Sequence, residues 1–315
     1  MKLGYSLSSE EMHPTDMVRW GAQAEAAGFS GIAISDHFHP WTNRQGQSPF
    51  VWDVLGALCA VTHDLRLGTS VTCPTVRIHP AILAQAAATT QAMARGRFFF
   101  GVGSGEALNE HILGDRWPEV DVRLDMLREA VEVMRRLWTG EQVSHHGRHY
   151  TVENAQLYTL PDQPPPVIVS GFGPKAAQLA AEIGDGYFGT QPSSELLETY
   201  ERAGGTGPKL ALMKVCWGPD EQAARELAYE LWPTIGISGE LSQELPVPAH
   251  FEQATENVSV DDVADAISCG PDPAVHLASV RKYADAGYDE VFVQQIGPAQ
   301  DEFFKFWTDE MSPEL

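Results

Sequence analysis

Two kinds of segment alternate along the chain, and they differ in the spacing of their hydrophobic residues. Short apolar runs, such as residues 31–34 and 98–102, indicate strands that are buried on both faces. Longer segments repeat apolar residues every three or four positions, as Leu124, Leu127 and Val131 do, which predicts amphipathic helices. We predict strands at residues 2–8, 31–35, 65–72, 97–102, 167–170, 186–190, 209–217 and 289–295. We predict helices at residues 14–27, 49–62, 80–94, 121–139, 174–183, 195–203, 221–231, 262–267, 273–286 and 301–310.

Eight strands that alternate with helices are typical of an α/β fold, the (β/α)8 or TIM barrel, and we predict one such domain over residues 1–315. Residues 145–160 are interpreted as an irregular arm. Residues 234–260 contain two prolines and two glycines but little periodicity, so we predict an inserted excursion near the C-terminal rim, over the active site. The length also allows two ordinary domains. A doubly wound open sheet is the alternative topology, but no GxGxxG turn follows the first strand.

The composition is that of a globular protein with a strong negative charge. Hydrophobic residues make up 43% of the chain, and the formal net charge is −22. Nucleic acid and anionic membranes are therefore not expected as partners. The chain has no apolar run near the ~18 residues of a membrane-spanning helix, and residues 1–5 show no signal-peptide pattern. The four cysteines are far apart and form no CxxC pair, so we expect reduced thiols, no zinc site and a cytoplasmic protein.

Polar residues gather directly after two of the predicted strands. Asp36, His37, His39 and Trp41 follow the second strand, and Glu106 lies in the cluster after the fourth. Because the carboxyl ends of the strands carry the active site in an α/β barrel, the two clusters predict one pocket. A neutral histidine beside a carboxylate can accept a proton at physiological pH, which makes His37 a candidate general base. A metal site on the same residues is the competing interpretation, but an HxH pair supplies too few ligands and we expect no metal.

Two glycine-containing turns are candidates for contacts with a ligand. Gly105 would let a ligand approach the backbone closely, and the following Glu106 could serve as an acid, a base or a partner of a ring nitrogen. Glu106 could equally be a carboxylate that is favoured at the start of a helix. The second turn, residues 171–175, joins the fifth strand to a helix. Backbone N–H groups at such a start can hold a phosphate, and Lys175 adds a cation there.

Several short motifs occur together between residue 1 and about residue 190. They are Ser-Asp-His-Phe at 35–38, Pro-Trp at 40–41, Leu-Gly-Thr-Ser-Val at 67–71, the stretch 101–110, Trp-Pro-Glu at 117–119 and Gly-Asp-Gly at 184–186. On these motifs the sequence resembles the luciferase-like (β/α)8 superfamily of flavin and deazaflavin enzymes. Within it, the sequence is most similar to the branch of glucose-6-phosphate dehydrogenases that depend on the deazaflavin coenzyme F420. The likeness is weaker after residue 190.

The resemblance implies a role for each matching residue. His37 matches the active-site base, Glu106 matches a second catalytic acid or base, and Trp41 lines the pocket beside them. Ser70 and Val71 match a non-prolyl cis peptide beneath the cofactor ring. The other positions that match cofactor contacts are Asp36, Cys73 (a threonine in the family), Ser104, Gly105, Asn109, Phe172, Gly173, Lys175 and Ala176, of which the last four match the segment that holds the phosphate and tail.

The substrate side departs from the family pattern. Where the dehydrogenases hold the sugar phosphate with two lysines and an arginine, this chain has Ser193, Ser242 and Ala266, while the accompanying threonine is kept as Thr190. A phosphate needs charge-assisted donors, so glucose-6-phosphate is not the expected substrate. The resemblance thus implies a homodimeric dehydrogenase that transfers hydride between F420 and an alcohol or unphosphorylated sugar, with Thr190 and Ser193 in the substrate site. An FMN-dependent luciferase-like monooxygenase and a non-catalytic deazaflavin-binding barrel are the alternatives.

Overall fold

The computed structural model describes residues 1–314 and contains a closed barrel of parallel strands. The strands pair in the order β1, β2, β3, β4, β7, β8, β9, β11 and back to β1, so the sheet closes on itself. The prediction of a TIM barrel is therefore confirmed. The barrel strands are β1 (Lys2–Leu7), β2 (Gly31–Ile34), β3 (Arg66–Thr69), β4 (Phe98–Val102), β7 (Val167–Ser170), β8 (Gly186–Gly189), β9 (Lys209–Cys216) and β11 (Glu290–Gln295).

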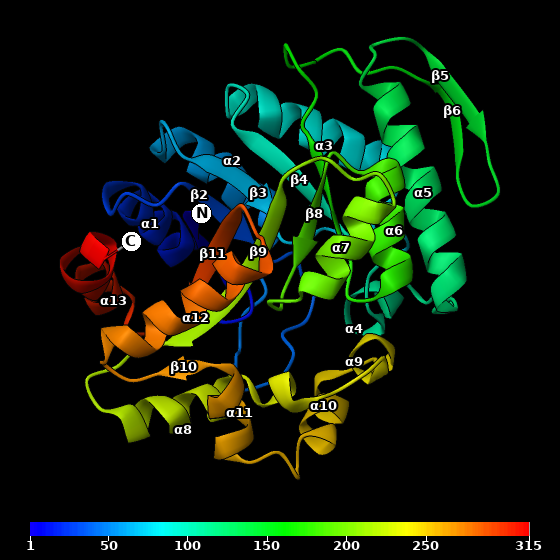
Figure 1. Ribbon diagram of the computed structural model, residues 1–315. Coiled ribbons are helices and arrows are strands. Elements are labelled where there is room, and N and C mark those ends of the chain that lie inside the picture. Colours follow the sequence, from blue (N-terminus) through cyan, green and yellow to red (C-terminus); the bar gives the residue numbers. More distant parts are fainter. Residues whose placement is uncertain (315) are drawn as a thin grey trace.

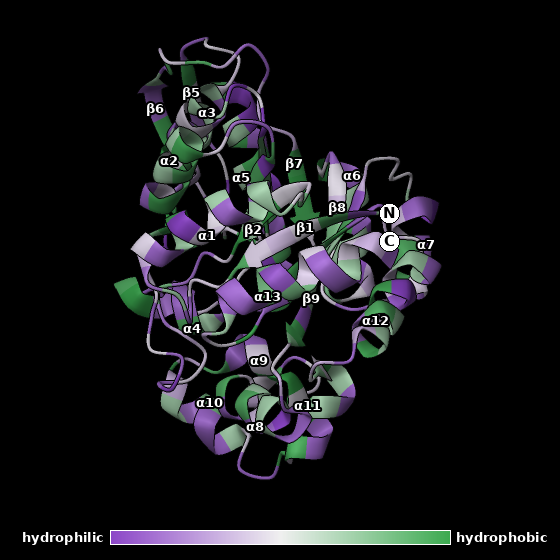
Figure 2. Ribbon diagram, turned by 90° about the vertical axis from the view of Figure 1, so that its left-hand side faces the viewer, coloured by the Kyte–Doolittle hydropathy of each residue, from purple (hydrophilic) through white to green (hydrophobic). Residues whose placement is uncertain are grey.

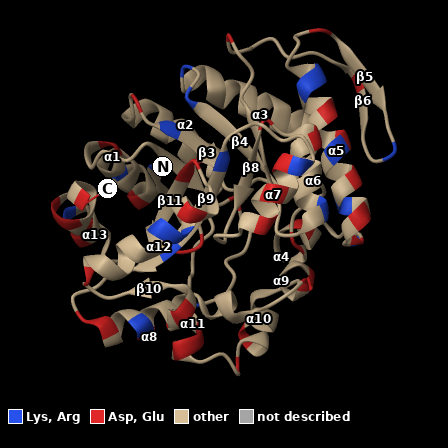
Figure 3. Ribbon diagram, viewed as in Figure 1, with Lys and Arg blue, Asp and Glu red and all other residues tan. Residues whose placement is uncertain are grey.

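Helices cover the outside of the barrel (Figure 1). In α5 the buried residues include Leu127, Val131 and Met134, at three- and four-residue steps. Acidic residues occur on α5, α8 and α11, and α5 carries basic residues as well (Figure 3). Within residues 1–314, no helix is long and apolar enough to cross a membrane. The covering helices are α1 (Pro14–Ala26), α2 (Val51–Val61), α3 (Pro80–Met93), α5 (Val120–Leu137), α6 (Pro174–Ile183), α7 (Ser194–Arg202), α8 (Glu221–Leu231), α12 (Pro273–Ala286) and α13 (Gln300–Phe306).

Side chains that alternate along the strands fill the inside of the barrel. This inner cluster consists of Ala33, Phe99, Ile168, Phe188, Leu210, Leu212 and Phe292, with Val71 packed against it. A larger apolar core lies between the strands and the helices, and strands such as β2 and β7 are largely hydrophobic (Figure 2). Because side chains on a strand alternate between its two faces, the next inward positions toward the carboxyl ends are Ser35, Ser170, Thr190, Lys214 and Gln294. The mouth of the barrel is therefore lined by polar residues.

The segment between α8 and α11 contains short helices where the sequence predicts an irregular excursion. They are η2 (Pro233–Gly236), α9 (Leu241–Glu244) and α10 (Pro248–Ala254), followed by α11 (Val260–Ala266). One or two turns are too short for a hydrophobic period to show in a sequence. The segment packs against loops that follow other strands: the rings of Phe251 and Trp41 lie 5.2 Å apart, and Arg123 donates a hydrogen bond to Glu244. Helices α8 to α11 thus gather at the carboxyl end of the barrel (Figure 1).

The arm at residues 145–160 also contains regular structure, which corrects the sequence-based interpretation. β5 (Val143–His146) and β6 (Thr151–Ala155) form an antiparallel hairpin beside α5 (Figure 1). Its polar composition hides the strand pattern, and a distant residue holds it: Glu129 of α5 accepts hydrogen bonds from the backbone N–H groups of His149 and Tyr150. A short strand that the sequence does not predict, β10 (Ser268–Cys269), extends the sheet beside β9. The four cysteines are free thiols, and three of them are buried.

Candidate active site

His37 lies at the polar mouth of the barrel, in the loop that follows β2. Its Nδ1 atom is 3.4 Å from Oε1 of Glu10, and its Nε2 atom is 3.5 Å from Oε1 of Glu106. The ring of Trp41 stands edge-on to the imidazole, with the centroids 5.0 Å apart. Only 11% of the His37 side chain is exposed. The structure thus brings together the three residues that the sequence predicts for catalysis and adds Glu10 to them.

Glu10 is absent from the predicted site, although it is a buried carboxylate that faces His37. The hydroxyl groups of Ser8 and Ser35 donate hydrogen bonds to its Oε2 atom, at 2.8 and 2.7 Å. Burial opposes ionisation, but the charge of His37 and the hydroxyl donors outweigh it and lower the pKa of Glu10. Nδ1 of His37 donates a hydrogen bond to the His39 carbonyl at 3.3 Å and faces the Glu10 carboxylate, which leaves Nε2 as the proton acceptor. Glu10 could have been predicted from the sequence in the same way as His37, because it also follows the carboxyl end of a barrel strand, β1.

Asn109 joins the two loops that carry the candidate catalytic residues. Its Oδ1 atom accepts hydrogen bonds from the backbone N–H groups of Phe38 and His39, at 2.8 and 2.9 Å. Its Nδ2 atom donates to Oε1 of Glu106 at 2.6 Å. The His39 side chain lies 2.8 Å from the carbonyl of Leu108 and so adds a second link between the same loops. Asn109 therefore positions Glu106 relative to the histidine loop.

A buried ionic network surrounds Asp36, behind the histidine. Its carboxylate accepts hydrogen bonds from Oγ1 of Thr72 at 2.7 Å and from Nη2 of Arg77 at 2.9 Å. Nε of Arg77 also lies 3.5 Å from Oε1 of Glu110. Burial raises the pKa of Glu110 to about 7, although Arg77 acts against this rise, and burial also raises the pKa of the nearby Cys73 thiol. Arg77 and Glu110 have no predicted role, because only the tertiary structure shows that they hold Asp36.

The turn after β3 and the glycine loop after β4 form a bed at the mouth of the barrel. A cis peptide bond joins Ser70 and Val71, as the resemblance implies. Among residues 1–314, the buried Oγ of Ser70 has no hydrogen-bond partner. A Cβ on Gly103 would lie 2.8 Å from a Val71 methyl group, and Gly105 has a φ of +88°. Both positions, on either side of Ser104, therefore favour glycine. The two glycines allow close packing of this loop against Val71, Glu110 and Trp117.

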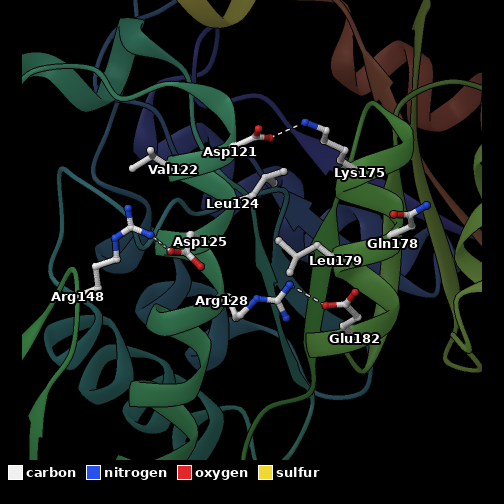
Figure 4. A pocket seen from close by; sticks show the side chains of 10 residues that line it. All are labelled: Asp121, Val122, Leu124, Asp125, Arg128, Arg148, Lys175, Gln178, Leu179 and Glu182. Carbon is white, nitrogen blue, oxygen red and sulfur yellow. Dashed lines mark hydrogen bonds and ion pairs between the residues drawn. The ribbon is translucent and has the colours of Figure 1, made fainter.

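The turn between β7 and α6 is open to solvent. Phe172 is 61% exposed, and no atom lies within 4 Å of the place where a Cβ on Gly173 would be. The N–H groups of the first turn of α6, which includes Ala176, are therefore accessible to an anion. Lys175 pairs with Asp121 at 2.6 Å, and both side chains are 69% exposed. The pair lies at a groove of about 460 Å³ between α5 and α6, which two further ion pairs line (Figure 4). A pair this exposed contributes little stability and can exchange its partner for a bound anion.

The predicted substrate residues lie together on the connection after β8. Thr190 is exposed, and its carbonyl accepts a hydrogen bond from the Tyr283 hydroxyl at 3.1 Å. Ser193 caps α7, because its Oγ accepts a hydrogen bond from the N–H of Leu196 at 3.3 Å. The Ser193 oxygen is therefore already engaged. In the described part of the chain, residues 1–314, no group of three or more His, Cys, Asp or Glu side chains is arranged to hold a metal ion.

The candidate site is thus the mouth of a (β/α)8 barrel that carries a histidine between two carboxylates, beside a cis peptide and a glycine loop. Residues 1–290 match the luciferase-like monooxygenase family, and the chain belongs to this family, as the resemblance predicts. F420-dependent glucose-6-phosphate dehydrogenases of Microbacterium testaceum and Segniliparus rotundus are 33% and 34% identical to it, over 100% of this chain and 97% and 98% of theirs. A solved structure, an F420-dependent secondary alcohol dehydrogenase in complex with an F420-acetone adduct, is similar with a TM-score of 0.91 and 31% identity, covering 98% of this chain and 97% of that one.

Proposed function

We propose that the protein is an F420-dependent dehydrogenase that transfers hydride between F420 and the CH–OH group of an alcohol or unphosphorylated sugar. The observation that carries the proposal is the position of His37 between Glu10 and Glu106, at 3.4 and 3.5 Å. The reaction class is supported by relatives of 31–34% identity over nearly the whole chain, which are named for F420 and for a sugar phosphate or a secondary alcohol.

The bed at the mouth of the barrel would hold the ring system of F420. Ser70 and Val71, joined by the cis peptide bond, would lie on one side of it and the Ser104–Gly105 loop on the other. The accessible N–H groups at the start of α6 would hold the phosphate of the cofactor tail, beside Lys175. Bound F420 supplies the acceptor for the hydride that leaves the carbinol carbon.

The residues of the chain handle the proton and the surroundings of the reaction. His37 accepts the proton of the substrate hydroxyl at Nε2, within reach of a pocket that Trp41 lines. Glu10 stabilises the resulting imidazolium, because it is ionised and faces Nδ1. Glu106, on the Nε2 side, can take up or return a proton. Phe251 packs on Trp41 from the excursion and helps to keep water away from the pocket.

The substrate is uncharged at the end that lies away from the reacting carbon. Ser193 caps α7, and Ser193, Ser242 and Ala266 offer no positive charge for a phosphate. A phosphate that enters such a pocket loses its hydration, and only cations or well-aimed donors replace it. An alcohol or a sugar without a phosphate loses less, which is why we assign that class.

Fluorescence titration of the purified protein with F420 and with FMN tests the cofactor assignment. We expect low-micromolar or tighter binding of F420 and much weaker binding of FMN, followed by loss of F420 absorbance when a secondary alcohol is added without oxygen. Equal or tighter binding of FMN would contradict the proposal and favour a monooxygenase. Tight binding of F420 without reduction by any alcohol or sugar would favour a non-catalytic carrier.

We also infer a homodimer in the cytoplasm, since the family resemblance implies one. Exposed apolar side chains on α2 and α3 support a contact with a second copy: Val61 is 40% exposed, Ile82 60% and Met93 48%. Light scattering after size exclusion decides the oligomeric state. A mass of 34.5 kDa, that of one chain, would contradict the dimer.

A further inference from the structure

Lys214 is a cation at the mouth of the barrel that the proposed reaction does not use. It lies on β9, two residues after Leu212, which belongs to the inner cluster of the barrel. Alternation along the strand therefore turns Lys214 inward, one layer closer to the mouth. The register pairs it with Gln294 of β11, which also follows an inner-cluster residue by two positions. Lys214 and Gln294 thus lie side by side on the inner face at the mouth of the barrel.

The ammonium group of Lys214 contacts an aromatic ring but, in the part of the chain that the structure describes, makes no hydrogen bond. Its Nζ atom lies 4.2 Å from the centroid of the Trp232 ring. Over residues 1–314 it has neither a hydrogen-bond partner nor a carboxylate within 4.0 Å. Burial lowers the pKa of Lys214, while the charges of Glu10 and Glu11 act in the opposite direction. Nζ is still reachable by solvent in the half-buried Lys214 side chain, so its three N–H donors are available to a ligand group that accepts hydrogen bonds.

Glu11 makes the surroundings of Lys214 rigid. Its carboxylate accepts hydrogen bonds from Nε1 of Trp232 at 2.6 Å and from the backbone N–H of Gly297 at 2.8 Å. The ring beneath the ammonium is thereby tied to the loop after β1 and the loop after β11. A fixed ring and a fixed strand place the ammonium before any ligand binds, which is the arrangement expected of a recognition group.

We propose that Lys214 donates hydrogen bonds to a second oxygen of a neutral, polyhydroxylated substrate whose other hydroxyl group gives its proton to His37. This inference rests on the proposed function and names the substrate class of that same site. The ligand group is neutral because Glu10 and Glu11 already balance the ammonium, and an anion would also meet Glu106. A hydroxyl or carbonyl oxygen accepts the free N–H groups without adding charge.

The test compares propan-2-ol with propane-1,2-diol, which differ by one hydroxyl group. In the wild type we expect a higher kcat/KM for the diol. Lys214→Met keeps the length of the side chain and its contact with Trp232 but removes the donors. We expect kcat/KM for the diol to fall about 10- to 100-fold, as for a lost hydrogen bond to a charged group, while the value for propan-2-ol changes less than about 3-fold. Lys282→Met removes the same charge from the exposed face of α12 and should leave both values unchanged.

A parallel loss for both alcohols in Lys214→Met would overturn the inference, because Lys214 would then act through Glu10 and His37. A wild type that reduces F420 with propan-2-ol but shows no preference for the diol would also overturn it and leave the proposed function standing. Quenching of tryptophan fluorescence by the diol in the cofactor-free protein gives a readout independent of turnover. Loss of that quenching in Lys214→Met supports the inference even if F420 is not the cofactor. Lys214→Gln keeps a neutral donor, and we expect it to retain part of the preference and to fold if the methionine variant does not.

Discussion

Replacement of Glu10 by glutamine tests the central step of the proposed mechanism. Glutamine keeps the size of the side chain and an oxygen that accepts the hydroxyl protons of Ser8 and Ser35, so the loop retains its shape. What is lost is the charge that faces Nδ1 of His37 at 3.4 Å. At an effective dielectric constant of about 20, that attraction is on the order of 5 kcal/mol once the imidazole is protonated. Because the remaining amide dipole and local rearrangement recover part of it, we expect kcat to fall about 10²- to 10³-fold.

The measurement is the steady-state loss of F420 absorbance with a saturating secondary alcohol. We expect KM to change less than about 3-fold, since the charge matters only after the proton has moved. Glu290→Gln is the matched control. Glu290 is also a buried carboxylate that accepts a serine hydroxyl and pairs with an arginine, but it lies at the start of β11, at the opposite end of the barrel. We expect Glu290→Gln to lower the free energy of unfolding without lowering kcat. A Glu10→Gln variant with near wild-type kcat would refute the role of Glu10.

Four further outcomes follow from the same structure. His37→Ala should lower turnover about 10²- to 10⁴-fold, the usual contribution of a general base, while the Kd for F420 changes little; unchanged turnover would remove His37 from the mechanism. Phe251→Ala should lower the free energy of unfolding by about 3–5 kcal/mol in denaturant titrations, since the ring is fully buried against Trp41. Glu110→Gln should alter how stability depends on pH: the pKa of Glu110 is raised from 4.5 to about 7 in the fold, so the wild type should lose about 3 kcal/mol relative to the variant between those two pH values. Parallel unfolding curves at both pH values would contradict this. Glucose should give a higher kcat/KM than glucose-6-phosphate, and the reverse order would indicate that Lys214 binds the phosphate instead of a neutral oxygen.

Hydrophobic pattern was sufficient to predict the barrel, because its strands are buried on both faces. Runs such as residues 31–34 and 98–102 are apolar without interruption, and the structure places strands there. The hairpin of β5 and β6 and the short helices α9 and α10 escaped prediction for a different reason. Partners distant in sequence hold them, Glu129 for the hairpin and Trp41 for α10. No local pattern encodes such contacts.

The sequence predicts only part of the candidate site, because only some of its residues occur in a recognisable local pattern. Strand-end clusters identify His37 and Glu106, because several polar residues occur together there. Glu10 and Lys214 stand in ordinary surroundings, one after a turn and the other within an apolar strand. Their role depends on which face of the strand points inward and on which loop lies opposite. That information comes from the register of the closed barrel, where Lys214 pairs with Gln294 and Glu10 meets the loop of His37.

The order of strands around the barrel separates two sets of residues. The positions that match cofactor contacts follow β2, β3, β4 and β7, which are four consecutive strands of the closed sheet. Glu10, Thr190, Lys214 and Gln294 belong to or follow the other four, β1, β8, β9 and β11. His37 bridges the two halves, since it belongs to the β2 loop and faces Glu10 across the β1–β2 pair. A change of substrate therefore needs new side chains on one half only, and the positions that depart from the dehydrogenase pattern, Ser193, Ser242 and Ala266, all follow strands of that half. On this arrangement we expect substitutions on the half with β8 and β9 to change the preferred substrate, and substitutions on the half with β3 and β4 to change cofactor binding.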